Sequence, residues 1–495
     1  MLCAAVLRGG GRARAPRLPV ESTTSASSGG GRRAAHAALA LSDMPTPRGL
    51  PVVGTSLALL WAGSAPRLHE YVDMRHRQLG PVFRDRIGPV SAVFVADPVE
   101  MRRTFGLEGK HPMHVLPEPW ILYNQLYGCK RGLFFMDGED WLHMRRVLNR
   151  LMLKPDQADV FAAPCRYIAD SLVCKWKSSN AGVVENLEEQ LYKWSLDTMI
   201  AVMAGSNYKM HCNKWNAIVQ HLPANIHKIF LESGRMSLIS AKYARACHLP
   251  VWKRFVNTVD ISLSTARTLV LEMIASCSSS SDGLLSEMLN TGVSEEDIIK
   301  VVADFIIAAG DTTALSLQWT LYLLAKNLEV QENIANEICE ETNVMQSALL
   351  KGVVREALRL YPVAPFLTRI MPESCVIGGY ELPPFELVLL SLYTSGRDTV
   401  NFPEPEKFWP ERWLRNTSNG SYKAVTNPHA SMPFAMGARS CIGKKLAETQ
   451  MIMTVASILK EFKIELLNVG DIEMVLRLVA VPSKPIQIRL TPRHK

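Results

Sequence analysis

The chain has 495 residues, of which 47% are hydrophobic and 21% charged, and its formal net charge is +8. This composition is that of a globular protein with a large core, and it excludes a disordered, a fibrous and a polytopic membrane chain. The ten cysteines include no CxxC pair, which favours neither a disulfide framework nor a zinc cluster. Most of them, including Cys174, Cys277 and Cys339, are predicted to be small buried hydrophobic residues in a reducing compartment.

The first 43 residues form a basic leader. They contain six arginines against Glu21 and Asp43, which gives a net charge of +4, half that of the whole chain. The leader is also rich in alanine, serine and glycine, a composition typical of an organelle transit peptide. The chain shows neither the apolar core of a secretory signal nor the roughly 20 apolar residues of a membrane anchor. We expect residues 1–43 to be a transit peptide that is removed or disordered, the alternative being a basic tail that stays in the cytosol.

A proline-rich entry segment follows the leader, and the folded domain is expected to span residues 44–495. Prolines at positions 45, 47 and 51 cannot continue a helix. Between Pro81 and Asp97, β-branched and aromatic residues flank Gly88-Pro89, which predicts a hairpin. Much of the region from residue 141 to residue 325 has helical spacing.

Two later helices are well marked. Ser294 stands before three acidic residues, and about thirty residues without proline follow, which predicts an N-cap and a long buried helix. Another helix is predicted from Ala348 to Leu360, before Pro362. Strands at Val376–Tyr380 and Leu387–Leu392, an irregular stretch over 402–413 and a helix after residue 441 complete the pattern. The predicted fold is mainly α with minor β, an α+β class, in a single large domain.

The segment from Phe434 to Gly443 reads FAMGARSCIG and carries the strongest chemical signal. Its Cys441 stands in a loop that opens a helix, where the helix N-terminus and backbone N–H groups favour a metal-binding thiolate. Taken alone, Cys441 would be a structural cysteine beside a glycine turn. The whole segment, however, matches FxxGxRxCxG at every fixed position and resembles the haem-binding loop of the cytochrome P450 family.

This resemblance implies the cytochrome P450 fold, a haem b cofactor and Cys441 as the axial ligand of the haem iron. A thiolate ligand pushes electron density onto the iron and favours O–O cleavage. The resemblance further implies that Gly437 permits the tight turn and that Gly443 lets the backbone approach the porphyrin. Phe434 completes the haem-binding pattern, and Arg439 is expected to pair with a haem propionate.

A second segment, Ala308–Thr313, reads AAGDTT and lies inside the long predicted helix. Alone, it would be a polar patch on a core helix. It resembles the oxygen-activation segment of the P450 family, which implies that Thr312 hydrogen-bonds the bound dioxygen and that Asp311 relays protons towards it. Many relatives carry glycine where this chain has Ala309, and we expect the local helix distortion to be reduced but not abolished.

Three further residues are assigned to a structural network. Glu356 and Arg359 stand three apart on one helical face, where they can pair. Such a pair is usually solvated. In the P450 family the same spacing forms a buried network with a later arginine, here Arg412, because buried arginines need a carboxylate partner.

Trp141 and Arg145 match the family's WxxxR segment, and Arg369 follows Pro362 by a few residues. The resemblance implies that these three side chains reach a haem propionate. The motifs occur in the family's order and cover the chain from about residue 50 to residue 490.

The transit-like leader resembles that of the mitochondrial class of P450s, which receives electrons from a [2Fe-2S] ferredoxin and its reductase. Lys351 and Arg355 match positions that dock the ferredoxin in this class, and Lys444 and Lys445 extend the basic surface. Such charge complementarity speeds association, although each cation alone would be an ordinary solvated charge. We expect a protein on the matrix side of the inner mitochondrial membrane, peripherally associated with it and without a nucleic-acid partner.

Three segments, 131–141, 358–366 and 389–397, resemble the Halloween group of arthropod steroidogenic P450s, and within it the shadow type, the ecdysteroid 2-hydroxylase. The implied reaction is hydroxylation of carbon 2 of 2-deoxyecdysone to give ecdysone. The alternatives are a mitochondrial P450 acting on another steroid position or a xenobiotic, and a non-catalytic haem or sterol binder, against which Thr312 and Cys441 argue. A steroid pocket is apolar with few polar anchors. Candidate walls are 114–123, 226–230, Ala308, Ala309 and 363–366.

Overall fold

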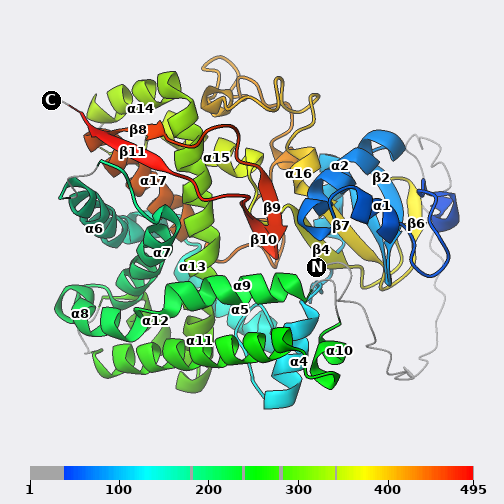
Figure 1. The fold of residues 1–495 in the computed structure, drawn as a ribbon, viewed down its shortest axis with the longest axis horizontal. Coiled ribbons are helices and arrows are strands. Elements are labelled where there is room, and N and C mark those ends of the chain that lie inside the picture. Colours follow the sequence, from blue (N-terminus) through cyan, green and yellow to red (C-terminus); the bar gives the residue numbers. More distant parts are fainter. Residues whose placement is uncertain (1–37, 179–181, 237–239, 278–281, 341–342, 494–495) are drawn as a thin grey trace, which may run out of the picture.

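The computed structural model describes residues 38–178, 182–236, 240–277, 282–340 and 343–493 (Figure 1). The helices are α1 (Ser56–Trp61), α2 (Leu68–Leu79), α3 (Pro98–Gly106), α4 (Glu118–Tyr127), α5 (Gly138–Met152), α6 (Gln157–Lys177), α7 (Leu187–Ala204), α8 (Asn207–Val219), α9 (Leu222–Arg235), α10 (Ala241–Ala246), α11 (Pro250–Ala275), α12 (Leu284–Leu289), α13 (Glu295–Lys326), α14 (Leu328–Glu340), α15 (Ala348–Leu360), α16 (Leu392–Ser395) and α17 (Lys444–Glu461). The strands are β1 (Leu39–Ala40), β2 (Val82–Ile87), β3 (Val90–Val95), β4 (Phe366–Ile370), β5 (Cys375–Ile377), β6 (Tyr380–Leu382), β7 (Leu387–Ser391), β8 (Phe462–Leu466), β9 (Met474–Arg477), β10 (Val479–Pro482) and β11 (Ile488–Pro492).

Helices dominate the molecule, and the strands form small sheets beside them. Figure 1 shows α6 to α15 and α17 in one large helical part, with α1, α2 and the four-stranded sheet at one side. That sheet has the order β2-β3-β7-β4, in which only β3 and β7 run parallel. The remaining strands pair as β1-β6-β5, β9-β10 and β8-β11. The predicted α+β class with mainly α content is therefore confirmed.

The predicted hairpin between residues 81 and 97 is confirmed as β2 and β3, which pair from Val82 opposite Val95 to Ile87 opposite Val90. The prediction of one strand over Val376–Tyr380 is wrong. Gly378 and Gly379 have φ of 60° and 85°, so the chain turns there and β5 and β6 form a second hairpin. Two consecutive glycines tolerate this left-handed backbone without steric cost.

The long helix α13 begins after Ser294, as the sequence predicts, and its 32 residues agree with the predicted length. The Ser294 hydroxyl accepts a hydrogen bond from the backbone N–H of Asp297 at 3.2 Å, and most side chains between Ile298 and Ala325 are buried. Helices α7, α11 and α15 pack against α13, so it forms the centre of the core. Helix α15 also has its predicted bounds, with Ser347 as N-cap.

The structure describes only the last residues of the predicted leader. Residues Leu39–Asp43, at the end of the predicted leader, form β1 and a short 3-10 turn, while residues 1–37 lie outside the described part. Within the described ranges, no helix has the length and apolar character required to cross a bilayer.

The prediction of buried cysteines is wrong for Cys174 and Cys339, which are exposed, and Cys277 is only partly buried.

Candidate active site

Cys441 lies in the loop that leads into α17. Its backbone N–H donates to the carbonyl of Phe434 at 2.9 Å, which closes the loop. The Cys441 side chain is exposed, yet burial raises the pKa of its thiol, while the Gly443 backbone and Arg145 act in the opposite direction. The residue is therefore accessible in its loop although protein atoms lie around its thiol. An accessible lone cysteine suits a cofactor metal, because iron is a partner that stabilises the thiolate.

The middle of α13 also borders unfilled space. Ala308 and Thr312 are exposed although the helix around them is buried, and they stand four apart on one face. The Thr312 hydroxyl donates to the carbonyl of Ala308 at 3.1 Å. The neighbouring carbonyl of Ala309 accepts a hydrogen bond from the Ser195 hydroxyl of α7 at 2.8 Å. The helix thus offers a small side chain and one hydroxyl to this space.

Asp311 lies on a different face of α13 from Thr312. It is buried, and the Tyr192 hydroxyl of α7 donates a hydrogen bond to its Oδ1. Burial raises the pKa of Asp311 to about 7, the hydrogen bond from Tyr192 lowers this pKa, and the charge of Glu188 raises it. Among the described residues, Oδ2 of Asp311 has no hydrogen-bond partner. A carboxyl group with such a pKa exchanges its proton near neutral pH.

Arg145 and Arg369 keep unpaired nitrogen atoms in the interior. Arg145 donates to the Ser440 hydroxyl at 3.3 Å, and its Nε has no partner within the described part of the chain. Arg369 donates to Glu108 at 2.5 Å and to the Thr368 carbonyl at 2.9 Å, which leaves its Nη2 without a described partner. Buried guanidinium groups with free donors fit an anionic group such as a haem propionate.

The Arg439 side chain makes several contacts with protein groups, besides the haem propionate that the resemblance implies as its partner. Its Nε donates to the Pro112 carbonyl at 2.6 Å, and its Nη2 donates to the Met136 carbonyl and to Asp137. The guanidinium also lies 4.3 Å from the ring centroid of the buried Trp141, a cation–π contact. Burial lowers the pKa of Arg439, and Asp137 acts in the opposite direction. Its anchors therefore fix the orientation of this side chain before any cofactor binds.

One residue near these arginines, Glu108, was missed by the sequence analysis, and His114 was predicted only as the first residue of the wall segment 114–123. Glu108 accepts hydrogen bonds from Arg369 and, at 2.8 Å, from the backbone N–H of Ala438 in the cysteine loop. Both ring nitrogens of His114 lack a partner among the described residues, and burial, with help from Arg439 and Arg369, lowers the pKa of His114 to about 3. No local motif marks Glu108, because its partners Arg369 and Ala438 lie far away in the sequence.

The predicted network around Glu356 is assembled in the structure. Arg359 donates two hydrogen bonds to the Glu356 carboxylate at 2.8 and 2.9 Å, and Arg412 donates one at 2.8 Å. The Trp413 indole adds a bond at 2.8 Å, and the backbone N–H of Trp409 adds one at 3.1 Å. All three charged side chains are fully buried, so the one carboxylate pairs with both guanidinium groups and offsets one of their two charges.

Four predicted docking cations surround one carboxylate. The charges of Lys444, Arg355, Lys445 and Lys351 all lower the pKa of Glu448 on α17, although burial outweighs them and raises it. Lys445 is also bound to backbone carbonyls, with 3.0 Å to that of Pro155. The structure therefore brings the four cations together next to the cysteine loop.

The predicted walls of a substrate pocket divide into two kinds. Trp120 and Tyr123 of α4 pack against Phe255 of α11 in a buried aromatic cluster, so they are core residues here. Ile226 of α9 is buried and touches α13, since its Cδ1 lies 3.0 Å from where a Cβ on Gly310 would stand. Ala308 is exposed on α13, and Ala309 beside it is partly exposed.

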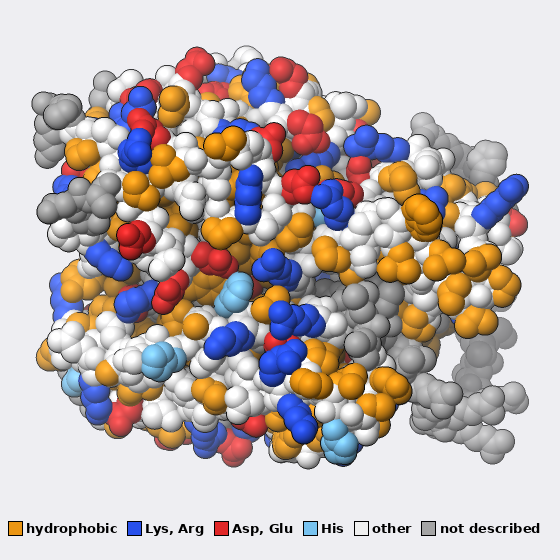
Figure 2. Space-filling view, viewed as in Figure 1, with side chains coloured by type: hydrophobic (Ala, Val, Ile, Leu, Met, Phe, Trp, Pro, Cys, Tyr) orange, Lys and Arg blue, Asp and Glu red, His pale blue; other side chains and the backbone are white. Residues whose placement is uncertain are grey.

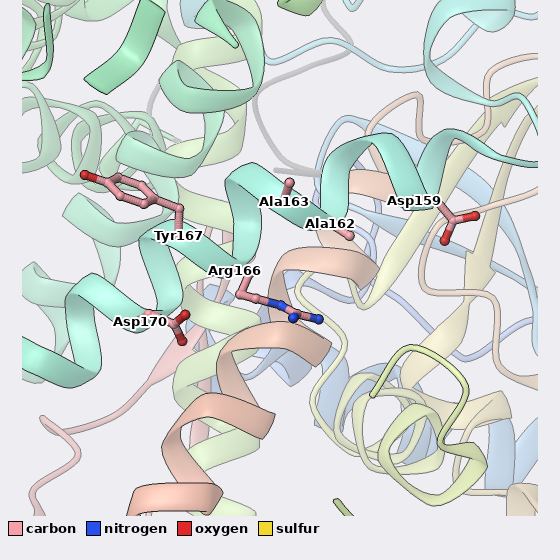
Figure 3. A pocket seen from close by; sticks show the side chains of 6 residues that line it. All are labelled: Asp159, Ala162, Ala163, Arg166, Tyr167 and Asp170. Atoms are coloured by element: carbon pink, nitrogen blue, oxygen red, sulfur yellow. The ribbon is translucent and has the colours of Figure 1, made fainter. Parts of the chain in front are cut away.

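A separate surface hollow of about 430 Å³ lies along α6 (Figure 3). Its lining side chains all come from α6 and include Arg166 between Asp159 and Asp170. None of the predicted site residues lines it, so it is distinct from the cysteine loop.

The chain matches the Cytochrome P450 family over residues 44–490. It is 38% identical over 480 residues to Cytochrome P450 315a1, mitochondrial, of Drosophila melanogaster, which covers 92% of this chain and 90% of that protein. It is 28% identical to the mitochondrial cholesterol side-chain cleavage enzyme of Oncorhynchus mykiss, with 86% and 85% coverage. It is 27% identical to the mitochondrial sterol 26-hydroxylase of Rattus norvegicus, with 92% and 89% coverage. These matches confirm the predicted family, so the chain belongs to the cytochrome P450 family and is a haem-dependent monooxygenase.

Proposed function

We propose that this protein is a mitochondrial steroid monooxygenase that hydroxylates carbon 2 of 2-deoxyecdysone to give ecdysone. The observation that carries the proposal is the 38% identity with the mitochondrial Cytochrome P450 315a1 of Drosophila melanogaster, which extends over 92% of the chain. The resemblance of segments 131–141, 358–366 and 389–397 to the shadow type supports the same substrate. The similarity to two mitochondrial sterol enzymes supports a steroid substrate in general.

The residues that hold the haem in this proposal follow from the site. Cys441 is assigned as the iron ligand, because the residue is accessible in its loop although protein atoms lie around its thiol. Arg145 and Arg369 bind the propionates with their free nitrogen atoms, and Trp141 supports Arg439 beside them. Phe434, Gly437 and Gly443 shape the cysteine loop. The bound haem supplies the activation of dioxygen, from which one oxygen atom enters a C–H bond and the other leaves as water.

The proposed tasks of α13 are positioning and proton transfer. Thr312 is exposed on α13, and its hydroxyl, which donates to the Ala308 carbonyl in this structure, is assigned to hydrogen-bond dioxygen. Asp311 stores a proton on its buried carboxyl group. The network of Glu356, Arg359 and Arg412 holds α15 to the segment before the cysteine loop, and it takes no part in turnover.

Electron delivery is assigned to a mitochondrial [2Fe-2S] ferredoxin and its reductase. Lys351, Arg355, Lys444 and Lys445 form a cationic surface around Glu448, which an acidic ferredoxin complements. Residues 1–43 are proposed as the transit peptide that directs the protein to the mitochondrial matrix.

A peripheral contact with the inner membrane is proposed for the α1 end of the molecule. Figure 2 shows hydrophobic side chains gathered over this end, and Trp61 is 92% exposed. Contiguous exposed apolar side chains of this kind mark interaction sites. The exposed members are Leu50, Val52, Val53, Leu57, Leu60 and Trp61.

The test is product analysis with the purified protein, ferredoxin, ferredoxin reductase and 2-deoxyecdysone. We expect one added oxygen by mass spectrometry and a hydroxyl on carbon 2 by nuclear magnetic resonance. A new hydroxyl at another carbon would keep the enzyme class and overturn the position. Tight binding of the steroid without any product, in a preparation with a normal carbon monoxide spectrum, would instead favour a haem or sterol binder.

A further inference from the structure

A chain of polar side chains links the surface between α7 and α9 to Asp311. The Tyr192 hydroxyl donates to Oδ1 of Asp311, and the same oxygen lies 3.4 Å from Nδ1 of His227 on α9. Nδ1 of His227 lies 3.3 Å from Oε1 of Glu188, which stands one helical turn before Tyr192. The four side chains therefore form a continuous series of oxygen and nitrogen atoms at hydrogen-bond distance.

The series runs from water to the interior. The side chains of His227 and Glu188 are 33% and 37% exposed, whereas Tyr192 is 2% exposed and Asp311 1%. At the inner end, Oδ2 of Asp311 has no partner within the described residues. The outer end can therefore take protons from solvent, and the inner end has a free oxygen atom that can pass them on.

We propose that His227, Glu188 and Tyr192 relay protons from solvent to Asp311. The three are positioning residues, since they act through Asp311, and the inference rests on the proposed function of that carboxyl group. Hydroxylation of one C–H bond by dioxygen consumes two electrons and two protons and releases one water. In each transfer, Tyr192 gives its hydroxyl proton to Asp311 while it accepts the Nδ1 proton of a protonated His227, and the neutral imidazole left behind takes a proton back from water. The carboxylate of Glu188, 3.3 Å from Nδ1, favours this return to the protonated form.

The electrostatics of the buried members agree with such a concerted transfer. Burial, and next the charge of Asp311, raise the pKa of Tyr192, so the hydroxyl does not persist as a phenolate. The pKa of Asp311, raised to about 7 mainly by burial, lets this group accept and release a proton near neutral pH. The titratable groups that face Asp311 are Tyr192 and Glu188 from α7, with His227 of α9 behind them.

The first measurement is the infrared band of the protonated Asp311 carboxyl group in the full-length haem protein, assigned by its loss in Asp311→Asn and followed against pH. We expect a midpoint of about 7. Tyr192→Phe removes a hydrogen bond that favours the charged carboxylate, so its midpoint rises. Glu188→Gln removes a negative charge, so its midpoint falls. Midpoints that stay unchanged in both variants would overturn the relay. They would show that the two side chains pack between helices without changing the pKa of Asp311.

The second measurement is steroid product formed per electron consumed, with 2-deoxyecdysone as probe. We expect Tyr192→Phe and His227→Gln to lose at least about tenfold in product rate, with a larger solvent isotope effect, while the reduced carbon monoxide spectrum stays normal. Matched controls are Tyr208→Phe, another buried tyrosine, and Glu189→Gln, the exposed neighbour of Glu188. Both controls are expected to match the parent enzyme.

The outcomes separate the relay from the proposed function. If Asp311→Asn keeps full product yield, the role of Asp311 itself is wrong. If Asp311→Asn is impaired while the relay variants and the parent behave alike, the relay alone is overturned. The infrared titration needs no substrate, so it stands even if the steroid is not 2-deoxyecdysone.

Discussion

The carboxylate of Glu108 occupies the space that a side chain on Gly437 would need. A Cβ on Gly437 would overlap Oε1 of Glu108, and Gly437 has a left-handed φ of 78°. Glu108 also binds Arg369 and the Ala438 N–H, so it cannot move without breaking those contacts. Gly437 is thus required for two reasons, the left-handed φ of its backbone and the position of Glu108 beside it.

Gly437→Ala is expected to lower the free energy of unfolding by about 3 kcal/mol, the sum of a left-handed alanine and an overpacked site, and to reduce haem content. The control is Gly470→Ala, where φ is 71° but a Cβ would meet no atom within 4 Å. The control is expected to cost only about 1 kcal/mol. Urea unfolding measures both, and equal losses would show that Glu108 does not constrain the loop.

Glu356→Gln is expected to destabilise the fold by about 3 kcal/mol or more, because it leaves two buried guanidinium groups without a charged partner. Removal of an exposed pair, in Lys407→Gln, is expected to cost less than about 1 kcal/mol. Urea unfolding of the purified variants compares the two. A loss below 1 kcal/mol for Glu356→Gln would contradict the assigned structural role.

His76 is expected to make stability depend on pH. Burial lowers its pKa from the ordinary 6.5 to about 4, and its Nε2 lies 2.9 Å from the Ser391 hydroxyl. Between pH 6.5 and about 4 the unfolded chain therefore binds a proton that the folded protein does not. Since stability rises with pH wherever the unfolded state binds more protons, this group destabilises the fold as the pH falls through that window, by about 1.4 kcal/mol per pH unit.

Replacing the histidine by His76→Gln removes this contribution, so the slope of unfolding free energy against pH becomes shallower by one proton. The exposed His143→Gln serves as the control and is expected to leave the slope unchanged. Identical slopes for His76→Gln and the parent would contradict a neutral buried imidazole at this position.

Charge removal on the cationic surface is expected to weaken ferredoxin-supported turnover. Lys351→Gln and Arg355→Gln should each raise the KM for ferredoxin by about fivefold, equivalent to roughly 1 kcal/mol, with a weaker dependence on salt. The control Lys253→Gln, at an exposed position of α11, should change neither the KM for ferredoxin nor its dependence on salt. An unchanged KM in both surface variants would place the ferredoxin elsewhere.

The sequence signals that proved accurate are local ones. The Ser294 cap and the acids after it act within one turn, so the start of α13 follows from neighbouring residues. The same kind of signal was overlooked at Gly378 and Gly379, whose turn splits a predicted strand into two. The cysteine loop was identified because its ten residues are contiguous.

The contacts that complete the site are not local. Glu108 and Arg369 stand 261 positions apart, and Tyr192 and Asp311 stand 119 apart, so only the packing of the fold brings them together. Neither Glu108 nor Tyr192 belongs to a motif. The exposure of Cys174 shows the same limit, because the apolar character of a cysteine does not determine which helix face it occupies.

The central claim is that the Cys441 thiolate binds the haem iron. The most direct measurement is the spectrum of the reduced, carbon-monoxide-treated protein for the parent, Cys441→Ser and the control Cys375→Ser, which changes a partly buried cysteine outside the loop. We predict the thiolate-type Soret band in the parent and in Cys375→Ser, and its loss in Cys441→Ser. An unchanged band in Cys441→Ser would contradict the account.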